Sequence, residues 1–385
     1  MAELCGVVGI GQTKQDAKRI DVSVAGLVRE AAVRALDDAG CTWKDIDAVV
    51  IGKAPDMFEG LMMPELFLAD ALGAVGKPIL RVHTAGSVGG STALVAASLI
   101  QAGVHQRVLT VAYEKHSEGD VMWTLTIARP FSVAVVAGAG GYFAPLIRAY
   151  IRRSGAPEDT GIRVALKDRK NALKNPYTHI QIPDIDFEKI ASSPMLWDPI
   201  RYLETCPTSD GACAMVLASE EAAKKSPTPP AWIHASEMRS EPTMFSGRDQ
   251  VNPQAGRDCA ASLYKKAGIT NPRKELDVAE IYVPFSWFEP MWMENLGFAE
   301  EGSGWKMTYE GATAFDGDMP INCSGGVLSS NPIGASGMLR YAESAMQVRG
   351  QAGEHQVDGV RRALGHAYGG GSQYFAMWIV GNEKP

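Results

Sequence analysis

The feature that most constrains the fold is a regular alternation of strand-like and helix-like segments in the first third of the chain. The short apolar runs LCGVVGIG, IDAVVIG and PILRVHTAG are separated by DVSVAGLVREAAVRALDDAG and PELFLADALG. Strands that alternate with helices favour a parallel sheet covered by helices. The first long helical run has start signals in Asp21 and Ser23 and a stop signal in Gly40. We therefore predict an α/β fold.

The same rhythm returns in the last third, as AGRDCAASLYKKAGI, DVAEIYVPF, SGGVLSSNPIGASGMLRYAESAMQV and YFAMWIVG. In both halves a glycine-rich turn precedes a helix of small residues, in AGSVGGSTALVAASL and in SNPIGASGMLRYAESA. We predict two similar halves, residues 1–245 and 246–385. Residues from about 117 to 207 lack the strand rhythm, and we interpret them as an inserted lid or loop region that covers a site.

Composition excludes several classes of protein. Lys and Arg total 37 against 44 acidic residues, a formal net charge of -7, so there is no basic excess to bind nucleic acid or an anionic membrane. No stretch approaches the roughly 20 apolar residues of a membrane span, and MAELCGVVGIGQTK does not resemble a signal peptide. We expect a cytoplasmic protein.

The cysteines favour neither a disulfide framework nor a metal site. All six are scattered without CxxC spacing, which fits buried thiols in a reducing compartment. We therefore predict no bound metal. The six are Cys5, Cys41, Cys206, Cys213, Cys259 and Cys323.

Four short segments, in order along the chain, resemble those of a known superfamily. SVGGSTALVAASL resembles the thiolase segment that begins with the nucleophilic cysteine, and TSDGACAMVLAS resembles an SDGAAA-type strand. INCSGGVLSSNPIGASG resembles the NxxGG…GHPxGA stretch, and AYGGGSQ resembles the C-terminal CxGGGxG. The chain thus resembles the thiolase superfamily, in particular its sterol-carrier and lipid-transfer members and most closely the steroid side-chain-degrading aldolases. The resemblance implies the thiolase fold, with duplicated αβαβα layers, and a homodimer.

The usual thiolase machinery is replaced at each matching position. Ser87 stands where the nucleophilic cysteine is expected, Asn331 replaces the GHPxG histidine, and Ala367 replaces the second cysteine. Tyr282 takes the first position of the usual NEAF or HDCF segment. A hydroxyl without an activating base is protonated and weakly nucleophilic at neutral pH. The pattern resembles aldolases of the superfamily that lack the cysteine and cleave a β-hydroxyacyl-CoA into a ketone and a shorter acyl-CoA.

We therefore expect retro-aldol cleavage of a bulky β-hydroxyacyl-CoA, from a sterol or bile-acid side chain. CoA enters as part of the substrate thioester, and no tightly bound cofactor is expected. The resemblance also implies a small zinc-ribbon and OB-fold partner protein. Two alternatives stay open. One is an acyltransferase or thiolase that uses Ser87 or a displaced cysteine such as Cys323. The other is a non-catalytic subunit that binds lipid or acyl-CoA.

Tyr282 is the first candidate for acid/base work, because related aldolases use a tyrosine in this segment. Its ordinary pKa of about 10 would have to be lowered for a base. Those aldolases place a second tyrosine in the GHPxG segment, where this chain has Asn331, which could donate a hydrogen bond to the enolate oxygen. His366 and Tyr368 could supply the missing group, since histidine titrates near neutrality, but His366 could equally be a core residue.

Three further features have two interpretations each. Ser87 could donate a hydrogen bond at a helix start or serve as an N-cap. His83 could point into the pocket or simply pack. The segment YVPFSWFEPMWMENLGF could form core or dimer surface, or a wall for a large apolar acyl group. Its bulky residues are Trp287, Phe288, Met291, Trp292 and Met293.

Overall fold

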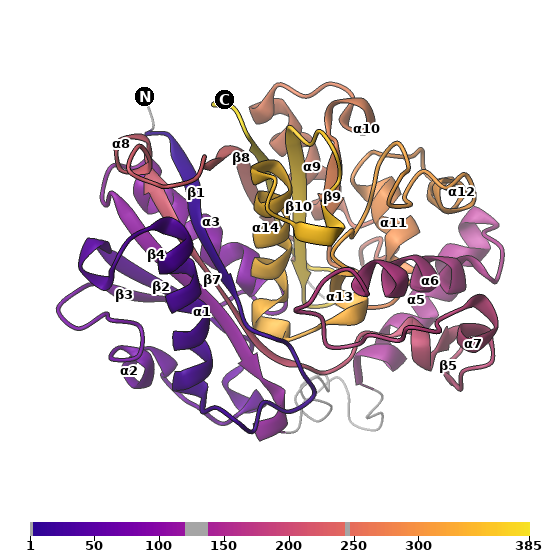
Figure 1. Cartoon of the computed structure of the whole chain (residues 1–385). Helices are drawn as coiled ribbons and strands as arrows, with labels where there is room; N and C mark the ends of the chain where they lie inside the picture. The colour runs from indigo at the N-terminus through magenta and orange to yellow at the C-terminus, as the bar shows by residue number, and fades with distance from the viewer. Residues whose placement is uncertain (1–2, 120–137, 243–246) are drawn as a thin grey trace.

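The computed structural model describes residues 3–119, 138–242 and 247–385, and its architecture is shown in Figure 1. Nine strands form one mixed sheet in the order β3-β2-β4-β7-β1-β8-β11-β10-β9. Its first segment comprises β3 (Ile79–Val82), β2 (Ala48–Gly52), β4 (Arg107–Lys115), β7 (Asp210–Ser219) and β1 (Cys5–Gln12). Its second comprises β8 (Ala231–Ser240), β11 (Tyr374–Gly381), β10 (Arg362–Gly369) and β9 (Val278–Glu280). The two segments join through only two residue pairs between β1 and β8.

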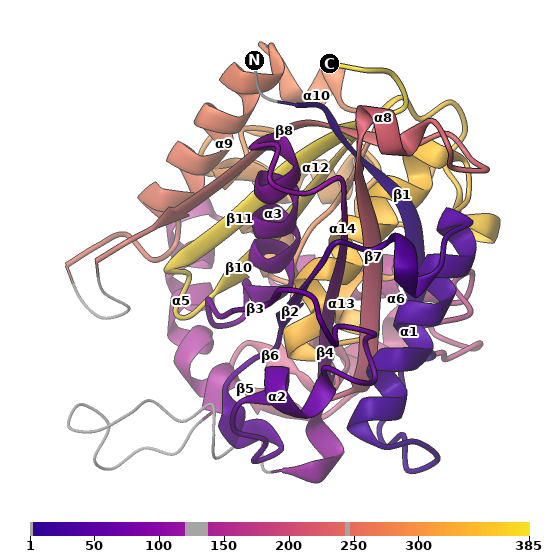
Figure 2. The ribbon, with the colours of Figure 1, turned by 90° about the vertical axis from the view of Figure 1, so that its left-hand side faces the viewer.

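Helices cover and separate these two segments. The helix α1 (Val24–Ala39) packs on β1 and β7, and α9 (Gln254–Ala267) packs on β8 and β11. Between the segments lie α3 (Val88–Gln101) and α14 (Ile333–Arg349), each of which contacts strands of both (Figure 2). The layers therefore run α, β, α, β, α, which confirms the predicted architecture. The boundary near residue 245 stays a prediction.

Small residues in the two central helices allow their backbones to touch. A Cβ on Gly89 would lie 2.5 Å from the Met338 backbone nitrogen, and a Cβ on Gly337 would lie 2.6 Å from the Gly90 nitrogen. Larger side chains would force the helices apart. The two glycine-rich helix starts recognised in the sequence therefore meet at the centre of the molecule.

The first segment of the sheet and its helix α1 match the sequence prediction, with one exception. The Ser23 hydroxyl accepts a hydrogen bond from Gly26 N–H, and Gly40 ends α1 in the left-handed conformation. The strands β2, β3 and β4 are parallel. However, β7 runs antiparallel to both β4 and β1, so the expected parallel sheet is mixed.

The inserted region packs beside the second segment of the sheet (Figure 1). Its described part forms α5 (Gly138–Ser154), α6 (Thr160–Ala172), α7 (Phe187–Ala191), β5 (Met195–Trp197) and β6 (Ile200–Arg201); residues 120–137 of the predicted lid lie outside the described residues. The other α-helices in the described part of the chain are α2 (Pro64–Leu68), α8 (Glu220–Ala223), α10 (Pro272–Glu275), α11 (Phe288–Asn295), α12 (Gly304–Tyr309) and α13 (Gly326–Ser329). Within the described ranges, no helix has both the length and the apolarity needed to cross a membrane.

Candidate active site

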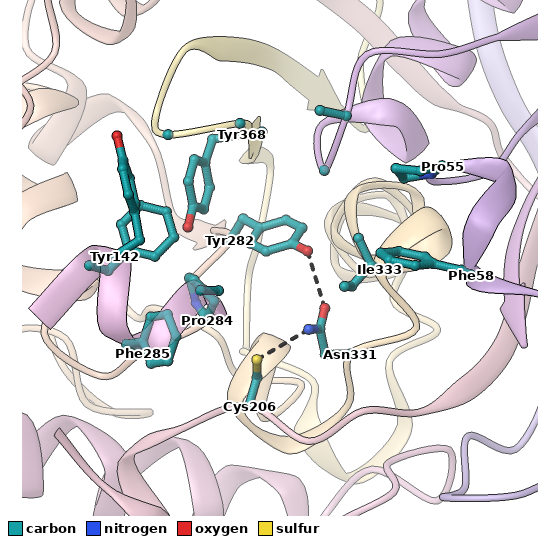
Figure 3. Close-up of a pocket in the computed structure, with 17 residues that line it drawn as sticks. Pro55, Phe58, Tyr142, Cys206, Tyr282, Pro284, Phe285, Asn331, Ile333 and Tyr368 are labelled. Carbon is teal, nitrogen blue, oxygen red and sulfur yellow. Dashed lines mark hydrogen bonds between the residues drawn. The ribbon is translucent and has the colours of Figure 1, made fainter. Parts of the chain in front are cut away.

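One pocket gathers residues that lie in, or one or two positions before, the four segments that carried the family resemblance (Figure 3). Gly86 precedes α3, Cys206 precedes β7, Asn331 precedes α14, and Tyr368 lies near the end of β10. The described residues enclose about 220 Å³. They are Pro55, Phe58, Ala85, Gly86, Ala139, Tyr142, Phe143, Cys206, Tyr282, Pro284, Phe285, Asn331, Ile333, Tyr368, Gly369, Gly370 and Gly371.

Tyr282 reaches the pocket because β9 ends early. The Ile281 N–H donates to the Asn322 side chain at 2.8 Å, and the Tyr282 N–H donates to His366 Nδ1 at 3.3 Å, instead of continuing a strand ladder. Pro284 has no N–H to donate. The strand that we predicted over DVAEIYVPF is therefore too long, since it stops at Glu280.

Asn331 links two other pocket groups. It lies in the break between α13 and α14, directly before Pro332, and a residue before proline is disfavoured in a helix. Its Oδ1 accepts hydrogen bonds from the Tyr282 hydroxyl at 3.1 Å and the Ser336 hydroxyl at 2.8 Å. Its Nδ2 donates to Cys206 Sγ at 3.1 Å. Tyr282, Asn331 and Cys206 therefore form a continuous hydrogen-bonded chain (Figure 3).

Burial keeps the titratable groups of the pocket neutral. It raises the pKa of Tyr282 and of Tyr368 above the ordinary value of a phenol. It also raises the pKa of the Cys206 thiol to about 11, although the Asn331 hydrogen bond and the Arg169 charge act in the opposite direction. Tyr282 would need a lowered pKa to act as a base, but its burial raises this pKa. Among the described lining residues there is no Asp, Glu, His, Lys or Arg.

The other sequence candidates lie in three different environments. Tyr368 lines the pocket and packs edge-to-face against Tyr282, with 5.2 Å between ring centroids. His366 is fully buried outside the lining, and burial lowers its pKa to about 3, so its imidazole is neutral. The Ser87 hydroxyl donates to the Thr84 carbonyl at 2.7 Å and borders a separate hollow. His83 is exposed and lines neither cavity. The structure thus brings Tyr282, Asn331 and Tyr368 together in the pocket lining. Ser87, His83 and His366 lie outside the lining, although His366 accepts the Tyr282 N–H behind it.

Ser87 occupies the N-cap position of α3 without forming a capping hydrogen bond. The bulky residues Trp287, Phe288 and Trp292 of the aromatic segment after Tyr282 are core rather than pocket wall, because they are fully buried and none of them lines the cavity. Only the start of the segment, Pro284 and Phe285, lines the pocket.

Cys206 is the pocket thiol that the sequence pattern does not single out. Its spacing predicts a structural thiol like the other five cysteines, and its place directly before PTSDGA is the one local signal for the pocket. The backbone around it is held from two sides: Cys206 N–H donates to the Pro284 carbonyl at 2.8 Å, and the buried Arg169 donates to the Thr205 carbonyl at 2.9 Å. By contrast, Cys323 is buried and lies outside the pocket. A displaced nucleophile would therefore have to be Cys206.

We expect alkylation of Cys206 to be slow at neutral pH and to accelerate about tenfold per pH unit from pH 7 to 10, because only the thiolate reacts and its pKa is about 11. A Cys41→Ser background leaves Cys206 as the one half-exposed cysteine of the chain. Iodoacetamide labelling followed by intact mass measures the rate. Fast labelling at pH 7 that does not depend on pH would contradict this and would favour a nucleophilic role.

Comparison with known proteins identifies the superfamily of this chain. Residues 237–382 match the family described as "Thiolase C-terminal domain-like". The chain is 30% identical over 374 residues to an acetyl-CoA acetyltransferase of Methanothermobacter thermautotrophicus, covering 94% of this chain and 96% of that protein. The chain belongs to the thiolase superfamily. Human sterol carrier protein 2 is 29% identical and is covered to 72% of its length, against 97% of this chain.

Among solved structures, this thiolase-superfamily chain is similar to the Ltp2-ChsH2(DUF35) aldolase. The TM-score is 0.85 at 25% sequence identity, and the match covers 100% of this chain and 99% of the other.

Proposed function

We propose that this protein cleaves a β-hydroxyacyl-CoA by a retro-aldol reaction. The β-hydroxyl loses its proton and becomes a carbonyl as the Cα–Cβ bond breaks. The electrons of that bond move to the α-carbon and the thioester oxygen, and a proton then adds to the α-carbon. The products are a ketone and a shorter acyl-CoA, and no free CoA or redox partner is consumed.

The observation that carries this proposal is the neutral Tyr282 phenol in a pocket whose described lining has no charged side chain. A thiolase reaction needs a thiolate, whereas Ser87 stands at the nucleophile position and Cys206 is protonated near neutral pH. A neutral phenol can relay protons without ionising: its oxygen accepts the β-hydroxyl proton while its own proton passes to the α-carbon. Asn331 Oδ1 holds the phenol in the resting site at 3.1 Å.

The start of α3 supplies the environment for the enolate oxygen. Ala85 and Gly86 line the pocket directly before this 14-residue helix. The N-terminal end of a helix carries partial positive charge, which favours an oxyanion. Gly86 also leaves room: a Cβ there would lie 3.1 Å from the Tyr368 carbonyl oxygen and 4.0 Å from the Tyr282 hydroxyl.

The similarity to the Ltp2-ChsH2(DUF35) aldolase supports both the reaction and a partner protein. That structure pairs two named proteins, and we propose that this chain likewise works with a small second subunit of the zinc-ribbon and OB-fold type. The family resemblance implies a sterol or bile-acid acyl group, so thioesters of this type are among the substrates to test.

Product analysis by mass spectrometry tests the proposal. The protein, with and without co-purifying partners, is mixed with tertiary β-hydroxyacyl-CoA thioesters, including the steroid side-chain type, in the absence of free CoA. Release of a ketone and a shorter acyl-CoA supports the aldolase. Cleavage of a 3-ketoacyl-CoA that requires free CoA, with an acylated Cys206 or Ser87 in the intact mass, would establish the acyltransferase instead. Binding without turnover of either class would favour the lipid-binding subunit.

The pH dependence of turnover follows from the neutral pocket. We expect kcat to stay constant within about twofold from pH 6 to 9, because no described lining residue changes its protonation in that range: the thiol of Cys206 titrates at about pH 11 and the pKa of Tyr282 is raised. Measurement of kcat at saturating substrate checks this. A bell-shaped profile centred near neutrality would contradict the neutral relay.

We also propose a homodimer that covers the open edge of the sheet. Large apolar side chains are exposed on α2, on the residues that flank it and on the edge strand β3, and α2 contacts β3; we propose that they form one association patch, because exposed apolar surface at a sheet edge favours association. Its members are Met62, Met63, Leu66, Phe67, Val75 and Leu80. We expect Phe67→Lys with Leu80→Lys to convert a dimer into a monomer in light scattering, while Ile20→Lys, at an exposed position outside the patch, leaves the mass unchanged. A wild-type protein that is monomeric at micromolar concentration would refute the proposal.

A further inference from the structure

Four aromatic rings form one side of the pocket next to Tyr282. Tyr142 and Phe143 come from α5, Phe285 follows Tyr282, and Tyr368 lies on β10; we call these four residues the aromatic wall. Tyr142, Phe285 and Tyr368 are labelled in Figure 3. Phe143 lies 5.9 Å from Phe285 and 6.5 Å from Tyr368, measured between ring centroids. Such rings present edges and faces against which another aromatic ring packs favourably.

The backbone of Gly369, Gly370 and Gly371 lines the same pocket without adding side chains. A Cβ on Gly371 would lie 2.4 Å from the Tyr142 hydroxyl, so any side chain there would collide with the aromatic wall. Gly370 has φ 64°, a conformation that favours glycine. These glycines leave space for a flat group beside the rings.

The size of the pocket limits that group. The described residues enclose about 220 Å³. An apolar cavity of about 150 Å³ is known to accommodate benzene, and pockets for larger ligands typically measure about 300–1,000 Å³. One aromatic ring with a short linker fits within this volume, whereas four fused rings would extend beyond it.

The wall is backed by core residues that resist expansion. Phe288 stacks on Tyr368 at 5.6 Å, and Trp292 packs edge-to-face on Tyr368 at 5.2 Å. Both are fully buried. Because protein interiors are close-packed, the wall cannot move back to admit a fused ring system without disrupting this core.

We propose that the substrate of this site carries a single aromatic ring on its β-carbon, seated against the aromatic wall. This inference rests on the proposed retro-aldol function for the chemistry, and the pocket alone selects the ring. The substrate class is a 3-aryl-3-hydroxyacyl-CoA. Its β-hydroxyl proton moves to the α-carbon as the Cα–Cβ bond breaks, which gives an aryl ketone or aryl aldehyde and a shorter acyl-CoA.

Binding of thioesters that cannot be cleaved tests the ring independently of turnover. Isothermal titration compares 3-phenylpropionyl-CoA, 3-cyclohexylpropionyl-CoA and a steroid side-chain acyl-CoA without a β-hydroxyl. We expect the phenyl thioester to bind about threefold to tenfold more tightly than the cyclohexyl thioester, from aromatic packing alone. We expect the steroid thioester to bind about tenfold more weakly than the phenyl one, since four fused rings exceed the volume beside the aromatic wall. Equal or tighter binding of the steroid thioester would overturn the inference.

Two variants locate the ring. Phe285→Leu and Tyr142→Leu should each remove the preference for phenyl over cyclohexyl, while Tyr202→Leu, at an exposed position outside the pocket, should retain it. The half-buried Tyr142 provides the test if Phe285→Leu does not fold. An unchanged preference in Tyr142→Leu and in a folded Phe285→Leu would contradict the placement.

Turnover of 3-hydroxy-3-phenylbutanoyl-CoA to acetophenone and acetyl-CoA then links the ring to the reaction. A phenyl preference in binding, with no β-hydroxyacyl-CoA cleaved, would sink the proposed function and leave the aryl site standing. Cleavage of steroid thioesters, with no preference for phenyl over cyclohexyl in binding, would support the retro-aldol function and contradict the aryl site.

Discussion

Replacing Tyr282 by Phe should lower kcat about 10²- to 10⁴-fold, the range typical for loss of a positioned acid/base group. The substitution removes one oxygen and retains the ring that packs on Tyr368. The proton relay is lost because the phenol is the pocket hydroxyl that is held by Asn331. We expect the affinity for a non-cleavable acyl-CoA to stay within about threefold, since the ring surface that the ligand meets is unchanged.

A matched control separates this effect from a general loss of stability. Tyr264 is also buried, and its hydroxyl donates to the Leu296 carbonyl at 2.7 Å, outside the pocket. Each Tyr→Phe change should cost about 1 kcal/mol of stability through the lost hydrogen bond, but only Tyr282→Phe should lose activity. A Tyr282→Phe protein with wild-type turnover would eliminate Tyr282 as the relay.

Replacing Lys167 by Met should destabilise the protein by about 3–5 kcal/mol, because it removes the cation from a buried charge cluster. Lys167 Nζ contacts Asp168 Oδ1 at 2.6 Å, Glu289 Oε2 at 2.9 Å and the Ile321 carbonyl at 2.7 Å. Both carboxylates are fully buried. The cluster joins α6 of the inserted region to α11, whose Trp292 donates to the Tyr282 carbonyl at 2.9 Å.

The stability lost on replacing Lys167 by Met should increase as pH rises. Burial already raises the pKa of Glu289 to about 7 in spite of the Lys167 charge. Without Lys167, the folded state favours the protonated carboxyl further, so the variant regains stability as pH falls below 7 and loses it as pH rises. Urea unfolding followed by tryptophan fluorescence should show a larger defect at pH 8 than at pH 5. Lys224→Met, which breaks an exposed pair with Glu221, should change stability by less than about 1 kcal/mol. A defect of the same size for both variants would contradict the argument.

Most of the fold could be predicted from local patterns. Alternating apolar runs, the cap at Ser23 and the stop at Gly40 identified the first helix and the strands around it, because these signals act over a few residues. The direction of β7 could not be predicted, since antiparallel pairing depends on which strand lies next to it in space. The early end of β9 likewise depends on side chains of Asn322 and His366, which lie 41 and 84 residues away in the chain.

The motifs brought Tyr282, Asn331 and Tyr368 to attention, and the tertiary structure decided how they differ from the other candidates. The Ser87 hydroxyl donates a hydrogen bond to the Thr84 carbonyl, and His366 accepts one from the Tyr282 N–H. The fold places these partners beside each other, and both candidates are therefore kept out of the pocket lining. Cys206 joins Asn331 across 125 residues of chain, a contact that no local pattern records.

The sequence by itself determined that this chain has two glycine-rich helix starts and that Ser87 stands where the family resemblance places the thiolase cysteine, because residue identity and short-range spacing are sufficient for both. Only the tertiary structure decided that the site is neutral. Burial, which depends on elements far apart in the chain, raises the pKa of Tyr282 and Cys206 and leaves a pocket whose described lining is free of charged side chains.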